Sequence, residues 1–203
     1  MKPLYILVLG AILIAGGVYI YLHRQSLGIF HSASTSDQPF KPAAISWMLV
    51  DRSREGFKLE MPADTREIEV PAYNESGATE PVDMLYAYPD PSTSFSISWA
   101  DQPPIVRASE NNPEQMLEDA RNGALERTQS VLVSEAQSIR QGFRVHDFAG
   151  RNQRGGVFDA RLVLAERRLY LLMASFPAAS ARRDEDVNRF FDSFRVVSAA
   201  SGQ

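Results

Sequence analysis

The chain contains no cysteine among its 203 residues. This absence excludes a framework of disulfide bonds, and it also excludes an N-terminal lipid anchor attached through a cysteine. Cysteine-free proteins occur on both sides of a membrane, so the composition leaves the compartment open.

A strong excess of charge of either sign is also missing, because 21 basic residues stand against 25 acidic ones and the net charge is −4. Proteins that bind nucleic acids usually carry a basic excess that pairs with phosphates. We therefore expect no nucleic acid among the partners of this chain.

Catalytic and cofactor motifs are absent as well. The sequence has no G-x-S-x-G elbow, no P-loop and no H-E-x-x-H pattern. Its three histidines, His23, His31 and His146, are too scattered for two of them to share one helix face. His146 and Asp147 would be neighbours on a strand, where adjacent side chains point to opposite faces. We therefore expect no enzyme, no catalytic residue, no cofactor and no metal site.

What the sequence does contain is one long uncharged run, LYILVLGAILIAGGVYIYL, bounded by Leu4 and Leu22. At about 1.5 Å per helical residue this run spans roughly 28 Å, which matches the hydrocarbon core of a bilayer. Tyr5 near one end, and Tyr19 and Tyr21 near the other, suit the headgroup layers. The run predicts one transmembrane helix at the start of the chain.

A cleaved secretory signal peptide is the alternative to a membrane anchor at residues 1–24. Cleavage after Gly17 would leave an apolar N-terminus, and cleavage after Ser34 would lie far from the apolar run. Lys2 gives a slight bias towards a cytoplasmic N-terminus. We therefore expect a single-pass protein of the inner (plasma) membrane whose C-terminal domain lies outside the cytoplasm, in the periplasm of a Gram-negative cell.

The rest of the chain divides by composition. Residues 25–44 are rich in Ser, Ala, Pro and Thr without a periodic apolar pattern, which is typical of a flexible linker. Residues 45–197 are long enough for one soluble domain with a single core. We expect residues 198–203 to be a disordered tail.

Alternating apolar and polar residues predict strands in the domain. They lie at about 57–62, 68–70, 82–88, 95–99, 130–133, 144–148, 157–164 and 169–176. Asn112 and Pro113 predict the start of a helix that runs to about Arg127. A closing helix carries four apolar residues on one side: Val187, Phe190, Phe191 and Phe194. Short turns join most of the strands, so we expect an α+β fold with an antiparallel sheet packed by two or more helices.

Four arginines are candidates for contact with an anion or a polar partner. Arg151 and Arg154 lie in a glycine-containing segment between two predicted strands, and Arg167 and Arg168 lie at the next hairpin turn. Guanidinium groups and glycine-rich backbone bind anions such as lipid headgroups. Solvated hairpin turns explain the same residues without any ligand.

Three short stretches resemble PsbP-like domains of uncharacterised membrane-anchored or exported bacterial proteins. They are GFKLEMP at 56–62, RLYLL at 168–172 and RFFDSF at 189–194. The resemblance covers nearly all of residues 45–197. It implies a PsbP-like α/β sandwich, in which helices pack on the faces of an antiparallel sheet, and a binding or assembly module rather than an enzyme.

We therefore expect a membrane-tethered, extracytoplasmic module that binds another envelope protein through a sheet edge or through loops. The alternative is a domain that binds a lipid or another small apolar ligand between sheet and helix. Five aromatic residues are candidates to line such a cavity: Tyr86, Tyr88, Trp99, Phe190 and Phe191. An accessible apolar cavity would favour the ligand, and a cleft with converging polar groups would favour an enzyme.

Overall fold

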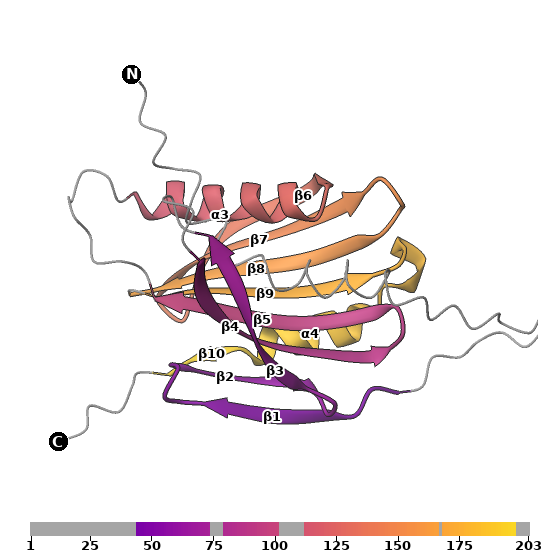
Figure 1. Ribbon diagram of the computed structural model, residues 1–203, viewed down its shortest axis with the longest axis horizontal. Coiled ribbons are helices and arrows are strands. Elements are labelled where there is room, and N and C mark those ends of the chain that lie inside the picture. Colours follow the sequence, from indigo (N-terminus) through magenta and orange to yellow (C-terminus); the bar gives the residue numbers. More distant parts are fainter. Residues whose placement is uncertain (1–43, 74–78, 102–111, 167, 198–203) are drawn as a thin grey trace, which may run out of the picture.

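The computed structural model describes residues 44–73, 79–101, 112–166 and 168–197 (Figure 1). The predicted membrane anchor, nearly all of the linker and the predicted tail lie outside these residues. The described part contains ten strands, two α-helices and one 3-10 helix. In chain order they are β1 (Trp47–Arg52), β2 (Phe57–Pro62), β3 (Arg66–Tyr73), β4 (Thr79–Asp90), β5 (Thr93–Asp101), α3 (Pro113–Arg127), β6 (Ser130–Arg140), β7 (Phe143–Asn152), β8 (Val157–Ala165), β9 (Arg168–Phe176), η1 (Ala179–Ala181), α4 (Asp184–Ser193) and β10 (Arg195–Val196).

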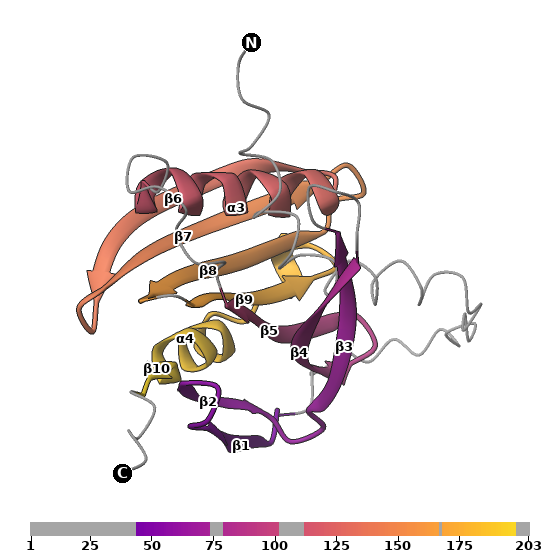
Figure 2. The same cartoon turned by 60° about the vertical axis from the view of Figure 1, so that its left-hand side comes forward.

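The strands form two antiparallel sheets. Seven strands make a large sheet in the order β3-β4-β5-β9-β8-β7-β6, and three make a small sheet in the order β1-β2-β10. One face of the large sheet carries α3, whereas α4 and the small sheet lie on the other face (Figures 1 and 2). The predicted α+β fold with an antiparallel sheet and two helices is therefore confirmed. Its outer strands are β3 and β6.

Each face of the large sheet has its own core. The core on the α4 side is aromatic: the ring centroids of Phe57 and Trp99 lie 5.0 Å apart, and those of Phe95 and Phe190 lie 5.3 Å apart. The core on the α3 side receives smaller residues from the helix, among them Ala120 and Ala124. Small side chains on α3 allow the helix axis to approach the sheet closely, whereas the phenylalanines of α4 fill a wider gap.

The helix starts follow the sequence signals closely. Asn112 caps α3, because its side-chain oxygen accepts a hydrogen bond of 3.0 Å from the backbone N–H of Glu114. The helix ends at Arg127, where the sequence predicts its end. Helix α4 begins with three acidic residues, which suit the positive end of the helix dipole. The sequence predicts that this helix includes Phe194, but the residue instead follows the helix in an extended conformation, where it is still buried.

Three strands differ most from the sequence prediction. Strands β1 and β10 are not predicted, and β6 continues to Arg140 instead of ending near Val133. The β6–β7 hairpin closes at Gln141 and Gly142, whose φ angles of 53° and 82° are both positive, as in a two-residue hairpin turn. Gln141 holds this turn against the chain end: its side chain donates a 2.9 Å hydrogen bond to the carbonyl oxygen of Phe194 and accepts one of 3.2 Å from the N–H of Val196.

The small sheet is fastened to the large one at the β1–β2 turn. The hydroxyl of Tyr170, on β9, donates to the carbonyl oxygen of Glu55 at 3.0 Å. Gly56 has a φ of 82°, and a Cβ atom at this position would come within 2.8 Å of the same hydroxyl. A side chain at residue 56 would therefore be strained and would also separate the two sheets.

Candidate interaction surface

The most exposed element of the described structure is β6, the outer strand of the large sheet (Figure 2). Every residue from Val131 to Arg140 is exposed. Several of these side chains are apolar: Ile139 is 74% exposed, Val131 69% and Val133 54%. Because an outer strand also has unpaired backbone N–H and C=O groups along one side, β6 offers a long edge for strand pairing.

The opposite edge of the sheet is protected by its sequence. Strand β3 exposes the charged residues Arg66, Glu67 and Glu69, and Pro71 removes one backbone donor. In contrast, β6 contains neither proline nor lysine, and its charges are limited to Glu135 and Arg140. A β-bulge between Leu132 and Ser134 is its one irregularity. The protection that is usual for an edge strand is therefore largely missing from β6.

A polar network on the α3 side fixes the middle of β6. Glu135 forms an ion pair with Arg121 of α3, and its Oε2 atom lies 3.0 Å from Nε2 of His146 on β7. The Arg121 guanidinium, followed by the His146 ring, holds the pKa of the Glu135 carboxyl below its usual range. The strand is thus tied both to its neighbour in the sheet and to the helix above.

His146 itself is fully buried, and its Nδ1 atom has no hydrogen-bond partner among the described residues. Asp147, the next residue, points to the other face of the sheet, where it binds Arg161. The side chains of His146 and Asp147 therefore point to opposite faces of the sheet, as the strand periodicity predicts. Within the described ranges, no three His, Asp or Glu side chains gather in a way that could hold a metal ion.

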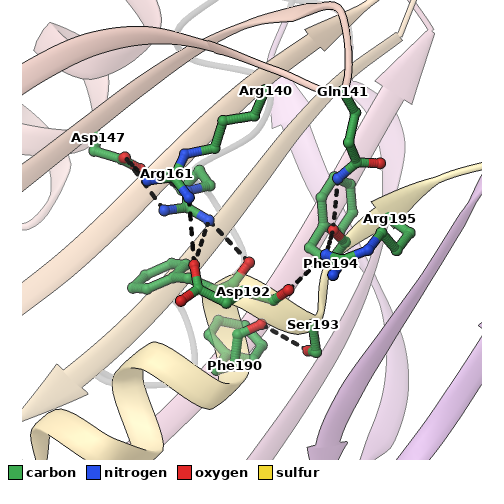
Figure 3. A network of polar contacts seen from close by, with 10 residues as sticks. Arg140, Gln141, Asp147, Arg161, Phe190, Asp192, Ser193, Phe194 and Arg195 are labelled. Atoms are coloured by element: carbon green, nitrogen blue, oxygen red, sulfur yellow. Dashed lines mark hydrogen bonds and ion pairs between the residues drawn. The ribbon is translucent and has the colours of Figure 1, made fainter.

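A second network, on the α4 side, fixes the tip of the β6–β7 hairpin (Figure 3). Arg161 of β8 binds both carboxylate oxygens of Asp147 and donates a 2.8 Å hydrogen bond to the carbonyl oxygen of Phe191, near the end of α4. Arg140, the last residue of β6, lies 3.3 Å from Asp192 of α4. With Gln141, these contacts attach the hairpin tip to the C-terminal segment. The β6 edge is therefore held in place before any partner arrives.

A groove lies beside β6 on each face of the sheet. On the α4 side a groove of about 270 Å³ has Ser134 and Ala136 of β6 in its wall, with Arg161 and Phe191 among the residues opposite. On the α3 side a groove of about 220 Å³ is lined by Gln137 and Ile139 together with residues of α3 and β7. A strand added to β6 would direct its alternate side chains towards these two grooves.

The arginines singled out in the sequence do not form one site. Arg151 and Arg154 are exposed at the end of the sheet where β7 meets β8. Arg168 lies at the opposite end of β8, since it pairs with Ala165, and Arg167 lies outside the described residues. Arg168 also binds both oxygens of Asp101, at 2.6 and 2.9 Å, and this partner raises the pKa of its guanidinium. Its function in the described structure is to join β9 to the neighbouring strand and turn.

The aromatic residues considered for a ligand cavity are mainly core residues. Trp99, Phe190 and Phe191 are buried in the core on the α4 side. Tyr86 and Tyr88 contact each other edge to face, with ring centroids 5.7 Å apart, and Tyr86 packs on the core below α3. Of these five side chains, Phe191 alone lines either of the grooves beside β6. Their arrangement gives no specific support to a lipid or apolar ligand.

The residues predicted to anchor the chain in a membrane fall outside the described part: Leu4, Tyr5, Tyr19, Tyr21 and Leu22. Neither α3 nor α4, the helices of the described ranges, has the length and apolar character that a bilayer crossing requires.

Sequence reasoning missed most of the β6 surface. The segment from Ser134 to Arg140 is mostly polar and buries no face, so it lacks the alternation by which a strand is usually recognised. The signal that was available is the Gln141-Gly142 pair, which precedes the predicted strand at 144–148 and marks a tight hairpin. A hairpin there requires a partner strand immediately before it.

Comparison with known proteins gives a likeness of fold. No model of a known protein family matches the chain, and no curated protein sequence matches it. The structure of cyanobacterial PsbP (CyanoP) from Synechocystis sp. matches over 81% of this chain and 98% of that chain, with 12% sequence identity and a TM-score of 0.52.

Two further solved structures match less well. The Ran-binding protein Mog1p from Saccharomyces cerevisiae covers 77% of this chain and 98% of its own length at 9% identity, with a TM-score of 0.47. Protein PA94 of unknown function from Pseudomonas aeruginosa covers 66% of this chain and 85% of its own length at 12% identity, with a TM-score of 0.33. Both TM-scores are below 0.5. The likeness to CyanoP, together with the two antiparallel sheets and two helices, shows that this chain has a PsbP-like α+β fold.

Proposed function

We propose that this chain is a non-catalytic protein-interaction module of the cell envelope, and that it binds its partner by strand pairing along β6. We further propose that its N-terminal segment tethers it to the inner membrane, with the folded domain on the extracytoplasmic side. The apolar run between Leu4 and Leu22 is the basis for the tether.

The observation that carries the proposed activity is the exposed edge of β6. Recognition by strand addition obtains affinity from backbone hydrogen bonds and specificity from side chains on the two faces of the sheet. The strand supplies both, because its outer backbone groups are unpaired in the sheet and a groove lies on each of its faces. The two polar networks add rigidity, which reduces the entropy lost on binding.

Substitution of Ile139 tests this proposal. Ile139→Lys places a charge on the exposed edge, and lysine on an edge strand opposes pairing with another strand. We expect the variant to fold normally but to fail to restore the wild-type phenotype when it is expressed in a deletion strain. Complementation is the measurement, with the amount of the variant in the membrane checked alongside.

Leu49→Lys is the matched control. Leu49 is 64% exposed and lies on β1, an outer strand of the small sheet, so the change in polarity is the same at a different edge. We expect this variant to complement. Normal complementation by Ile139→Lys, or equal failure of both variants at normal abundance, would contradict binding at β6.

A further inference from the structure

We infer that the strand that pairs with β6 is the β6 strand of a second copy of this chain, so that the two large sheets join across a twofold axis at Ala136. This inference rests on the proposed function, since it names the partner at the proposed surface. It follows from the order of the side chains along β6 and from the position of the bulge.

The faces of β6 are established by its register with β7. Glu135, Gln137 and Ile139 pair with Phe148, His146 and Arg144 and project towards α3 with them. Ser134, Ala136, Ser138 and Arg140 project towards α4. Because the bulge inserts one residue, Leu132 lies on the α3 side with Ile139, although regular alternation would place it on the other face. The bulge thus brings two exposed apolar side chains onto one face.

An antiparallel pairing of two β6 strands centred on Ala136 gives a compatible partner to each residue from Val131 to Arg140 except Val133, the extra residue of the bulge. Leu132 of each copy lies opposite Ile139 of the other, and Ser134 lies opposite Ser138. Glu135 lies opposite Gln137, whose amide group can donate to the carboxylate, and Val131 lies opposite the aliphatic part of Arg140. Opposed apolar or hydrogen-bonding pairs stabilise a sheet, and this register sets no two like charges directly opposite each other.

The neighbouring registers are less favourable. A twofold axis at Glu135 would place the Glu135 carboxylates of the two copies directly opposite, which is destabilising. An axis at Gln137 would oppose Glu135 with Ile139 and would carry Leu132 beyond the end of the partner strand. Registers in which the axis falls between residues would place side chains of opposite faces against each other. Charge and apolar matching therefore select the axis at Ala136.

The pair is expected to dissociate on dilution. One strand from each copy makes a small contact, and interfaces that bury less than about 1,200 Å² are typically weak. Tethering both copies in one membrane would raise their effective concentration and favour the pair.

Single introduced cysteines test the register in the full-length protein in isolated membranes. The chain has no native cysteine, so each variant carries one thiol. Residues directly opposite in an antiparallel pair have Cα atoms about 4.5–5.5 Å apart, within the range of a disulfide bond. Ala136→Cys should therefore yield a dimer of twice the chain mass under mild oxidation, which reduction separates.

Ser138→Cys is the matched control, because residue 138 lies on the same strand and face but its two copies would be roughly 14 Å apart. We expect Ala136→Cys to give about ten-fold more disulfide-linked dimer than Ser138→Cys. A mixture of Ser134→Cys and Ser138→Cys chains should cross-link with each other, although neither does so alone. Equal yields from Ala136→Cys and Ser138→Cys, or no dimer from Ala136→Cys in a folded protein, would overturn the inference.

A photo-crosslinking residue at position 139 separates this inference from the proposed function. An adduct of twice the chain mass agrees with the Ala136→Cys dimer. Adducts of another mass, together with the absence of that dimer, would leave binding at β6 intact and overturn the second copy as partner. If no adduct forms and Ile139→Lys also complements, the inference and the proposed function both fail.

Discussion

At the scale of single residues, the charged groups of this domain differ sharply in burial and in what they stabilise. Arg161 is buried, and its guanidinium group contacts two carboxylates, those of Asp147 and Asp192, and the carbonyl oxygen of Phe191. Arg182 also pairs with two acids, Asp159 and Asp184, but its side chain is about one third exposed. Solvent therefore screens the ion pairs of Arg182 more strongly than those of the buried Arg161.

Arg161→Ala should therefore lower the free energy of unfolding by about 2–4 kcal/mol, because it leaves Asp147 with only the longer contact to Arg140, at 3.7 Å, and removes the Arg161 donor from the Phe191 carbonyl. Arg182→Ala should cost less than about 1 kcal/mol. Chemical denaturation of the purified variants measures both changes. Similar losses for the two arginines would show that burial does not separate them.

At the scale of secondary-structure elements, α4 links the large sheet to the small one. Its apolar side packs Val187, Phe190 and Phe191 into the core, whereas Asn188 is exposed. The following residue, Phe194, extends the same packing surface and contacts the ring of Phe57 on β2. The helix and its C-terminal extension therefore stabilise the domain by filling space between two sheets.

Truncation of this surface should be costly. Phe190→Ala and Phe194→Ala should each lower the free energy of unfolding by about 3–5 kcal/mol, because both rings are buried and their removal leaves a cavity. Asn188→Ala, at an exposed position of the same helix, should change this free energy by less than about 0.5 kcal/mol. Denaturant titration gives these values, and losses below about 1 kcal/mol for both phenylalanines would contradict the packing described.

At the scale of the whole molecule, the proposed arrangement is a folded domain held at a membrane by its first residues. Such a tether would keep copies in one plane, where a weak contact along β6 could form. This arrangement requires that the apolar run stays attached to the domain.

The mature protein should therefore retain the apolar run from Leu4 to Leu22. Cleavage near Gly17 would leave a sticky apolar N-terminus, whereas an uncleaved run of this length suits a bilayer. N-terminal sequencing of the protein extracted from membranes is the measurement. A first residue of Val18 or Thr35 would identify the run as a signal peptide and remove the tether.

Much of the fold follows from the sequence alone because its signals are local. The alternation in Phe57–Pro62 is enough to place β2, and the side chain of Asn112 with the following proline is enough to start α3. Such patterns depend on neighbours within a few residues, and the core positions they mark are the ones the structure buries. The antiparallel α+β class follows from the short turns between these elements.

The candidate surface was decided only by the tertiary structure. Residues 134–140 form a strand because β7 pairs with them and because Gln141 and Arg140 bind the end of α4, which lies more than fifty residues later in the chain. Whether a strand lies at the edge or in the centre of a sheet depends on the order of all seven strands, and no local pattern encodes that order. The sequence therefore determines which residues β6 exposes, and the assembled sheet determines that they form a free edge.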